Sequence, residues 1–149
     1  MFFELHAGLP REGPGDDAST KRALRLLPDL SAHPGILDVG CGPGAQTLVL
    51  ARTTRGTVTA VDMHQPFLDE LMRRAGAAEL AENVRPLRAS MDALPFEQES
   101  FDLIWSEGAI YIMGFERGLR AWQRFVRHGG YVVVSELSWL AGDPPPHAR

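Results

Sequence analysis

The sequence contains little cysteine and no excess of positive charge. Its single cysteine, Cys41, cannot form a disulfide within the chain, and it excludes a zinc site built from several cysteines. The five histidines include no pair at the spacing of metal ligands, so we predict no metal site. The formal net charge is −4 over 149 residues, which argues against a nucleic-acid-binding surface.

Long apolar runs are also missing. No stretch is long enough to span a bilayer, and no polybasic patch suggests a membrane surface. The first residues, MFFELHAGLPREGPGDD, become acidic and rich in Gly and Pro too early for a signal peptide. We therefore expect a protein without membrane contact, in the cytoplasm, and its length fits one domain spanning residues 1–149.

Apolar patterning predicts helices that alternate with strands. The predicted strands are 35–39, 57–62, 84–89, 101–106 and 131–137, and the predicted helices are 16–27, 45–52, one from Pro66 onward, and 115–126. Asp17 or Ser19 is expected to cap the first helix. This alternation predicts an α/β fold with a doubly wound, mostly parallel sheet and helices on both faces. Pro86 cannot donate to a strand ladder, so 84–89 is expected at an edge.

A glycine-rich turn follows the first predicted strand, in the segment ILDVGCGPGAQT at 36–47. Gly40, Gly42 and Gly44 lie at the carboxyl end of that strand, where doubly wound sheets bind ligands. The same glycines would also suit a tight strand-to-helix turn without a ligand. With Ala45, the first two match the dinucleotide pattern G-x-G-x-x-A, so NAD remains one alternative.

Two carboxylates bear on the identity of the ligand. Asp38 precedes the glycines, where it would repel a pyrophosphate but suit a ligand with a positively charged group. Asp62 ends the second predicted strand, where a carboxylate can accept hydrogen bonds from two ribose hydroxyls. Asp62 fits NAD equally well, whereas Asp38 favours a different nucleotide-like ligand.

Four segments, taken together and in order, resemble the motifs of a known family. They are LDVGCGPGAQT, VTAVDM, SMDALPFEQESFDLIWSEGAIY and HGGYVVVSEL, and they are similar to class I S-adenosylmethionine-dependent methyltransferases, most of all the small-molecule branch called type 11. The resemblance implies a Rossmann-like sheet of order 3-2-1-4-5, with S-adenosylmethionine as cofactor and S-adenosylhomocysteine as product. Such proteins usually continue with two more strands, which we expect to be lacking here.

The resemblance implies a binding role for the glycine turn and the two carboxylates. Gly40, Gly42 and Gly44 would let the backbone approach the methionine part of the cofactor. Asp38 would anchor this region near the cofactor's ammonium group, directly or through water. Asp62 would hold the ribose hydroxyls.

Five further residues are implied on the adenine and methyl sides. Met63 would lie against the adenine, Asp92 would accept a hydrogen bond from its amino group, and Met91 and Ala93 would line its pocket. Glu107 would face the space near the reactive methyl. Each has an alternative: the methionines as core residues, Asp92 as a helix cap, and Glu107 as a solvated loop acid.

The implied reaction is the in-line displacement of a methyl group from a sulfonium to a small-molecule acceptor. The protein aligns the acceptor and excludes water, and a base is needed only if the acceptor keeps its proton. No catalytic residue is identified, and the candidates near the methyl are Glu107, Tyr111, His6 and Glu4.

Other expectations concern the ends of the chain and the alternatives. Residues 1–20 are expected to form a lid or a flexible segment, and 138–149 a tail. The fifth strand would lie at an open edge, which a homodimer could cover. A cofactor-binding or scaffolding module without catalysis and an NAD-dependent oxidoreductase are the other functions considered.

Overall fold

The fold is built on one five-stranded parallel sheet. The computed structural model describes residues 11 and 13–138, and its strands are β1 (Gly35–Val39), β2 (Thr57–Asp62), β3 (Val84–Arg88), β4 (Phe101–Glu107) and β5 (Val126–Ser135). They lie in the order β3-β2-β1-β4-β5, and every neighbouring pair is parallel. The predicted doubly wound topology is confirmed, and the strand that contains Pro86 lies at an edge as expected.

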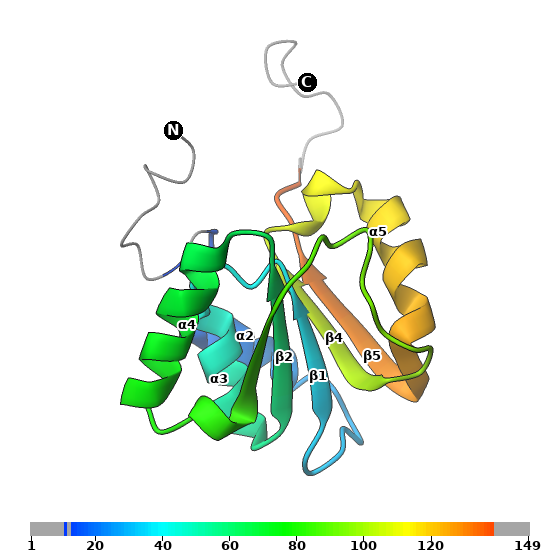
Figure 1. Ribbon diagram of the computed structural model, residues 1–149. Helices are drawn as coiled ribbons and strands as arrows, with labels where there is room; N and C mark the ends of the chain where they lie inside the picture. The colour runs from blue at the N-terminus through cyan, green and yellow to red at the C-terminus, as the bar shows by residue number, and fades with distance from the viewer. Residues whose placement is uncertain (1–10, 12, 139–149) are drawn as a thin grey trace.

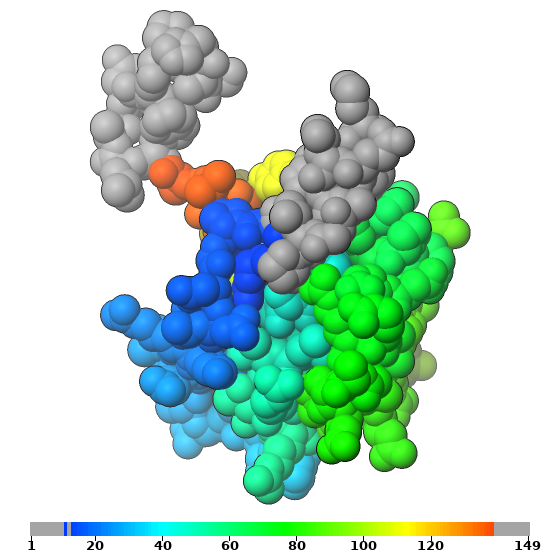
Figure 2. All heavy atoms as spheres, turned by 90° about the vertical axis from the view of Figure 1, so that its left-hand side faces the viewer, coloured from blue at the N-terminus to red at the C-terminus, as the bar shows by residue number. Residues whose placement is uncertain are grey.

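Helices cover both faces of the sheet (Figure 1). One face carries α2 (Asp17–Leu24), α3 (Ala45–Thr54) and α4 (Gln65–Ala77), which Figure 2 shows in blue, teal and green. The other face carries α5 (Phe115–Trp122). The part of the chain that the structure describes also contains three short 3-10 helices: η1 (Ala81–Asn83), η2 (Ile110–Ile112) and η3 (Gln123–Phe125). Within 11 and 13–138, no helix combines the length and the apolar character needed to cross a membrane.

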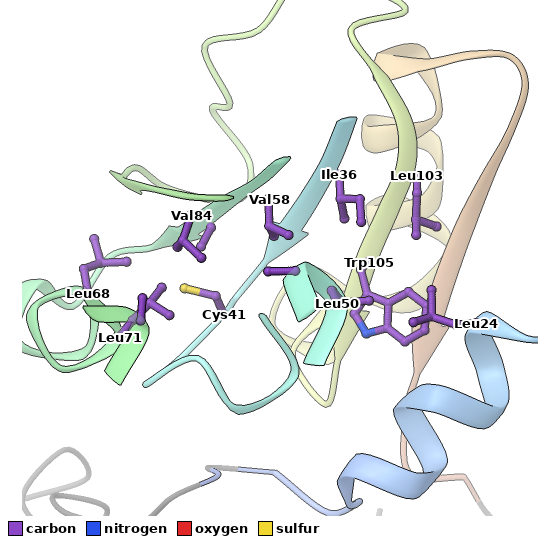
Figure 3. Close-up of a cluster of buried hydrophobic side chains, with 13 residues drawn as sticks. Leu24, Ile36, Cys41, Leu50, Val58, Leu68, Leu71, Val84, Leu103 and Trp105 are labelled. Carbon is purple, nitrogen blue, oxygen red and sulfur yellow. The ribbon is translucent and has the colours of Figure 1, made fainter. Parts of the chain in front are cut away.

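Strand residues alternate between two hydrophobic cores, one on each face. Ile36 and Leu103 point into the core beneath α2, α3 and α4, which Figure 3 shows together with Trp105 and Leu50. The next residue of β1, Leu37, belongs to the core beneath α5, as Ile104 does in β4. Each of these side chains is fully buried, which stabilises the fold by about 1.5–3 kcal/mol per residue. The central strands are therefore apolar on both faces, as strands between two helical layers must be.

The first described helix differs from its prediction at both ends. Asp16, rather than Asp17 or Ser19, is the N-cap, and its carboxylate accepts a hydrogen bond from the backbone N–H of Ser19 at 2.7 Å. The helix ends at Leu24, which is buried, whereas Leu26 is 73% exposed. Several residues here have suitable helix propensity, so the pattern could not locate the ends.

The segment expected as a helix over 115–126 is divided between three elements. α5 ends at Trp122, η3 follows, and β5 begins at Val126, so the strand starts five residues before the predicted position. The packing explains the early stop, because the buried Trp122 donates from Nε1 to the carbonyl of Met91 at 2.9 Å. No described strand pairs with the outer side of β5, so the proposed dimer at this edge stays a prediction.

Candidate functional site

A cavity of about 320 Å³ opens at the carboxyl ends of the strands. Most of its lining residues come from the ends of β1, β2, β3 and β4 and the turns after them, at the upper edge of the sheet in Figure 1, and Gly13, Phe67 and Arg117 complete the lining. Cavities of this size and position are typical of small-molecule and cofactor sites. Seven of the ten predicted site residues line it, namely Gly40, Gly42, Asp62, Met63, Met91, Asp92 and Glu107.

The glycine turn runs very close to the residues that follow β4. Gly40 has a φ of +73°, and a Cβ atom there would lie 2.5 Å from the Cβ of Ala109. The backbone N–H groups of Gly40 and Cys41 donate to the carbonyl of Val61 at 2.9 Å and 3.0 Å. Sterics and hydrogen bonds therefore both fix the turn against β2 and β4, and glycine is required at position 40.

Gly44 serves packing rather than the cavity. A Cβ atom there would meet the side chain of Leu71 in α4, closer than any real contact. Gly44 lines neither described cavity near the turn, and the same holds for Ala93. The backbone approach that Gly44 permits is between the start of α3 and α4.

Asp62 joins the second strand to the glycine turn. Its Oδ2 accepts a hydrogen bond from the backbone N–H of Gly42 at 3.0 Å, and its Oδ1 accepts one from that of His64 at 2.9 Å. A carboxylate offers about four acceptor positions, so both oxygens can accept further donors. Asp62 is thus a fixed acceptor pair on the wall of the cavity.

Asp38 is fully buried beneath the turn. Thr47 donates from Oγ1 to its Oδ2 at 2.6 Å, and Gln46 donates from Nε2 to its Oδ1 at 3.3 Å. Burial raises the pKa of Asp38 to about 7, against the two hydrogen bonds, which lower it. Asp38 lines neither cavity near the turn. Its hydrogen bonds with Thr47 and Gln46 hold the first turn of α3 onto β1. A contact between Asp38 and a cofactor stays a prediction.

Glu107 ends β4 and is held by three donors. Its Oε1 accepts from Thr20 Oγ1 at 2.7 Å and from Trp105 Nε1 at 2.9 Å, and its Oε2 accepts from Arg11 Nη1 at 2.5 Å. The alternative in which Glu107 is a solvated loop acid is therefore wrong. A second, small cavity of about 20 Å³ lies between Arg11 and the glycine turn, and Glu107 lines both cavities.

Sequence reasoning missed the three partners of Glu107. Trp105 lies inside an apolar strand, and Thr20 lies in an amphipathic helix, so neither shows a motif. Arg11 is 96 residues from Glu107 in a segment rich in Gly and Pro. The only available signal was Glu107 itself, a carboxylate directly after a buried strand.

Met63 and Asp92 differ from the alternatives considered for them. Met63 is 62% exposed on the cavity wall, so it is not a core residue. No helix follows Asp92, and its Oδ1 accepts a hydrogen bond from Ser90 Oγ at 2.5 Å, so it is not a helix cap. Met91 is half-buried and packs against the core beneath α5 while lining the cavity.

The remaining candidates are distributed unevenly. Tyr111 lines the cavity and is exposed, whereas His6 and Glu4 lie outside the described residues, as do most of the predicted lid and nearly all of the tail. Burial raises the pKa of the Cys41 thiol well above its ordinary value, which fits a packing role. Among residues 11 and 13–138, no group of three or more His, Cys, Asp or Glu could hold a metal ion.

Comparison with known proteins places this geometry in a family. The family model for a methyltransferase domain matches residues 36–130. The malonyl-[acyl-carrier protein] O-methyltransferase of Salmonella typhimurium is 34% identical over 158 aligned positions, which cover 99% of this chain and 57% of that protein.

Solved structures share the fold. Geranyl diphosphate C-methyltransferase from Streptomyces coelicolor A3(2), solved with Mg²⁺, geranyl diphosphate and S-adenosyl-L-homocysteine, superposes with a TM-score of 0.72 at 21% identity, over 78% of this chain and 44% of that one. The [4+2]-cyclase SpnF superposes with a TM-score of 0.77 at 25% identity, over 93% of this chain and 53% of that one.

The chain spans about half the length of the curated relatives that it matches. The family match covers well over half of the chain, and it runs from β1 to β5. The chain therefore belongs to the methyltransferase domain family, within the class I S-adenosylmethionine-dependent methyltransferases.

Proposed function

We propose that this chain binds S-adenosylmethionine and transfers its methyl group to a small-molecule acceptor. The observation that carries the proposal is the position of Asp62, which ends β2 on the wall of the large cavity. Its two oxygens are each held by one backbone N–H and keep capacity to accept two hydroxyl donors. This is the acceptor pair that a ribose requires.

The other residues of the cavity fit the rest of the cofactor. The turn at Gly40 and Gly42 offers backbone without side chains to the methionine part. Met63 and Met91 offer apolar surface to the adenine, and Asp92 offers a carboxylate to its amino group. The cavity is lined by three acids, Asp62, Asp92 and Glu107, and by one cation, Arg117. Glu107 is paired with Arg11, and the remaining acids, Asp62 and Asp92, favour a cationic ligand over a dinucleotide pyrophosphate.

The chemistry divides between cofactor and protein. When bound, S-adenosylmethionine supplies a methyl group on a positively charged sulfur, which makes that carbon electrophilic. The protein's part is to hold the acceptor in line and to keep water out. Glu107, which ends β4, and five residues after it line the wall that we assign to the acceptor, namely Gly108, Ala109, Tyr111, Ile112 and Met113. Tyr111 is the exposed group there that can exchange a proton with the acceptor.

Two alternatives predict different binding and turnover. A module that binds the cofactor without transferring methyl groups is consistent with the same fold, since a [4+2]-cyclase shares it. An NAD-dependent oxidoreductase would need a pyrophosphate site at the turn, which the buried carboxylate of Asp38 and the lining acids disfavour.

Calorimetric titration tests the proposal directly. The purified chain is titrated with S-adenosylmethionine, S-adenosylhomocysteine and NAD. We expect affinities of about micromolar for the first two, roughly −8 kcal/mol, and no binding of NAD. Binding of NAD alone would overturn the proposal, and binding without methyl transfer to any acceptor in a broad panel would favour the non-catalytic module.

A further inference from the structure

Arg117 is the single cation among the described residues that line the large cavity. It lies in the first turns of α5 and is exposed, and within 11 and 13–138 it has neither an ion pair nor a hydrogen bond. Nearby arginines are engaged differently. Arg120 pairs with Glu116 at 3.7 Å, and Arg127 pairs with Asp102 at 3.0 Å. Arg117 is therefore a guanidinium that faces a cavity without a counter-charge of its own.

The same wall of the cavity carries exposed apolar side chains. Tyr111 and Ile112 in η2 are 57% and 65% exposed, and both line the cavity together with Met113. These residues lie between Glu107, at the end of β4, and Arg117 in α5. Large apolar side chains left in water on a cavity wall indicate a ligand surface. None of them has a role in the cofactor site described above.

The charges of the cavity impose an orientation on any anion that enters. Asp62 and Asp92 repel a negative group along the β2 and β3 turns, whereas the charge of Glu107 is balanced by its ion pair with Arg11. Arg117 attracts it, and its planar guanidinium can bind a carboxylate or a phosphate through two parallel hydrogen bonds. The attractive and repulsive contributions therefore favour the same arrangement, with the negative end of the molecule at α5.

We propose that the methyl acceptor is an amphipathic anion whose carboxylate or phosphate pairs with Arg117 while its apolar part lies on Tyr111, Ile112 and Met113. This inference rests on the proposed function, because it assigns the acceptor side of the same cavity. Arg117 acts as a specificity-determining residue: it positions the acceptor relative to the residues after β4 and takes no part in bond making.

Short amphiphiles of one chain length provide the test. Octanoate, octyl phosphate, octanol and octylamine are titrated calorimetrically into the protein with and without saturating S-adenosylhomocysteine. The variants are Arg117→Gln and, as the matched control on the same helix, Arg120→Gln. We expect the two anions to bind about tenfold or more tightly than octanol in the parent protein. Comparing the carboxylate with the phosphate identifies which anionic group the site prefers.

The variants and the salt dependence make the result decisive. Arg117→Gln should remove the preference for the anions, whereas Arg120→Gln should keep it, and added salt should weaken it in the parent protein. Equal binding of octanol and octanoate to the parent, or an equal loss in both variants, would overturn the inference. Circular dichroism of both variants checks that they are folded.

Failure of this inference differs from failure of the proposed function. If S-adenosylhomocysteine binds and no anion preference appears, only the assignment of the acceptor is wrong. If S-adenosylhomocysteine does not bind, the proposed function fails. An anion preference that persists in that case would make Arg117 a simple anion site and overturn its assignment to a methyl acceptor.

Discussion

Arg11 and Glu107 form an ion pair across 96 residues of sequence, with 2.5 Å between Nη1 and Oε2. Both side chains are about nine-tenths buried, at 12% and 11% exposure. Arg11 also pairs with Asp17 in the first turn of α2 at 3.1 Å. The segment before α2 is thereby tied to the end of β4, on the walls of both cavities.

Removing this ion pair should loosen the segment before α2. In Arg11→Gln, Glu107 keeps Thr20 and Trp105 as donors, so the global fold should persist. The lost charge-assisted hydrogen bond contributes about 1.5–3 kcal/mol, so amide hydrogen exchange over residues 13–20 should accelerate about tenfold or more. Arg22→Gln, an exposed change within α2, is the control and should exchange at the parent rate. Unchanged exchange in Arg11→Gln would show that the ion pair does not hold the segment.

Replacing Asp62 should weaken cofactor binding strongly. Asp62→Ala removes the proposed acceptors for the ribose hydroxyls and also the acceptor for the Gly42 N–H. The loss of about 1.5–3 kcal/mol corresponds to a roughly ten- to 150-fold lower affinity for S-adenosylmethionine by calorimetry. Asp69→Ala, an exposed carboxylate of α4, should bind as the parent does. Parental affinity in Asp62→Ala would place the ribose elsewhere.

Asp38 should make the stability of the protein depend on pH. Its pKa rises from 3.8 to about 7 on folding, so between these values the folded chain holds a proton that the unfolded chain has lost. The contribution of Asp38 to the free energy of unfolding is therefore most favourable below the pKa that it has in the unfolded chain. This contribution is lost as the pH rises towards 7, at about 1.4 kcal/mol per pH unit.

The amide variant Asp38→Asn removes this titration and keeps the shape of the side chain. The free energy of unfolding by urea, compared at about pH 5 and about pH 8, should fall less in this variant than in the parent. Asp69→Asn serves as the exposed control and should follow the parent. Parallel pH profiles for Asp38→Asn and the parent would show that Asp38 keeps an ordinary pKa.

The close approach at Gly40 yields a paired prediction. Gly40→Ala forces a side chain onto a residue with φ of +73°, at about 1–2 kcal/mol, and brings its Cβ within 2.5 Å of the Cβ of Ala109. We expect a lower melting temperature and a weaker affinity for S-adenosylmethionine. Adding Ala109→Gly relieves the contact but not the backbone strain, so it should restore part of the loss. No rescue in the double variant would assign the whole effect to the backbone.

Patterns of short range predicted the sheet well and the helix ends poorly. The apolar segments predicted all five described strands, because the burial of a strand leaves an apolar pattern within the few residues of the strand itself. The start of β5 was misplaced because Val126, Arg127 and His128 continue a plausible helical pattern, and only the packing of Trp122 ends the helix there. Such a tertiary contact leaves no local signal.

In the candidate site, too, some features follow from local sequence and others depend on tertiary contacts. The positions of the glycine turn and Asp62 were predictable, because residue type, spacing in the sequence and position at the end of a predicted strand all agree. The burial of Asp38 was not, because its partners Thr47 and Gln46 become visible only when α3 folds back on β1. Arg117 was not singled out at all, since its position on the cavity wall depends on how α5 lies against η2.

All neighbouring strands in this sheet are parallel, and this has a consequence for the order of folding events. No two neighbouring strands of the described sheet can pair through a hairpin, and β1 meets β4 across 67 residues, since Gly35 N–H donates to the Asp102 side chain and Ile36 pairs with Leu103. Such long loops must close before the sheet is complete, which slows folding relative to proteins with local contacts. The ligand cavity exists only once β1, β2 and β4 are joined. A ligand bound in this cavity therefore stabilises the folded state mainly by lowering the unfolding rate, and it does not raise the folding rate.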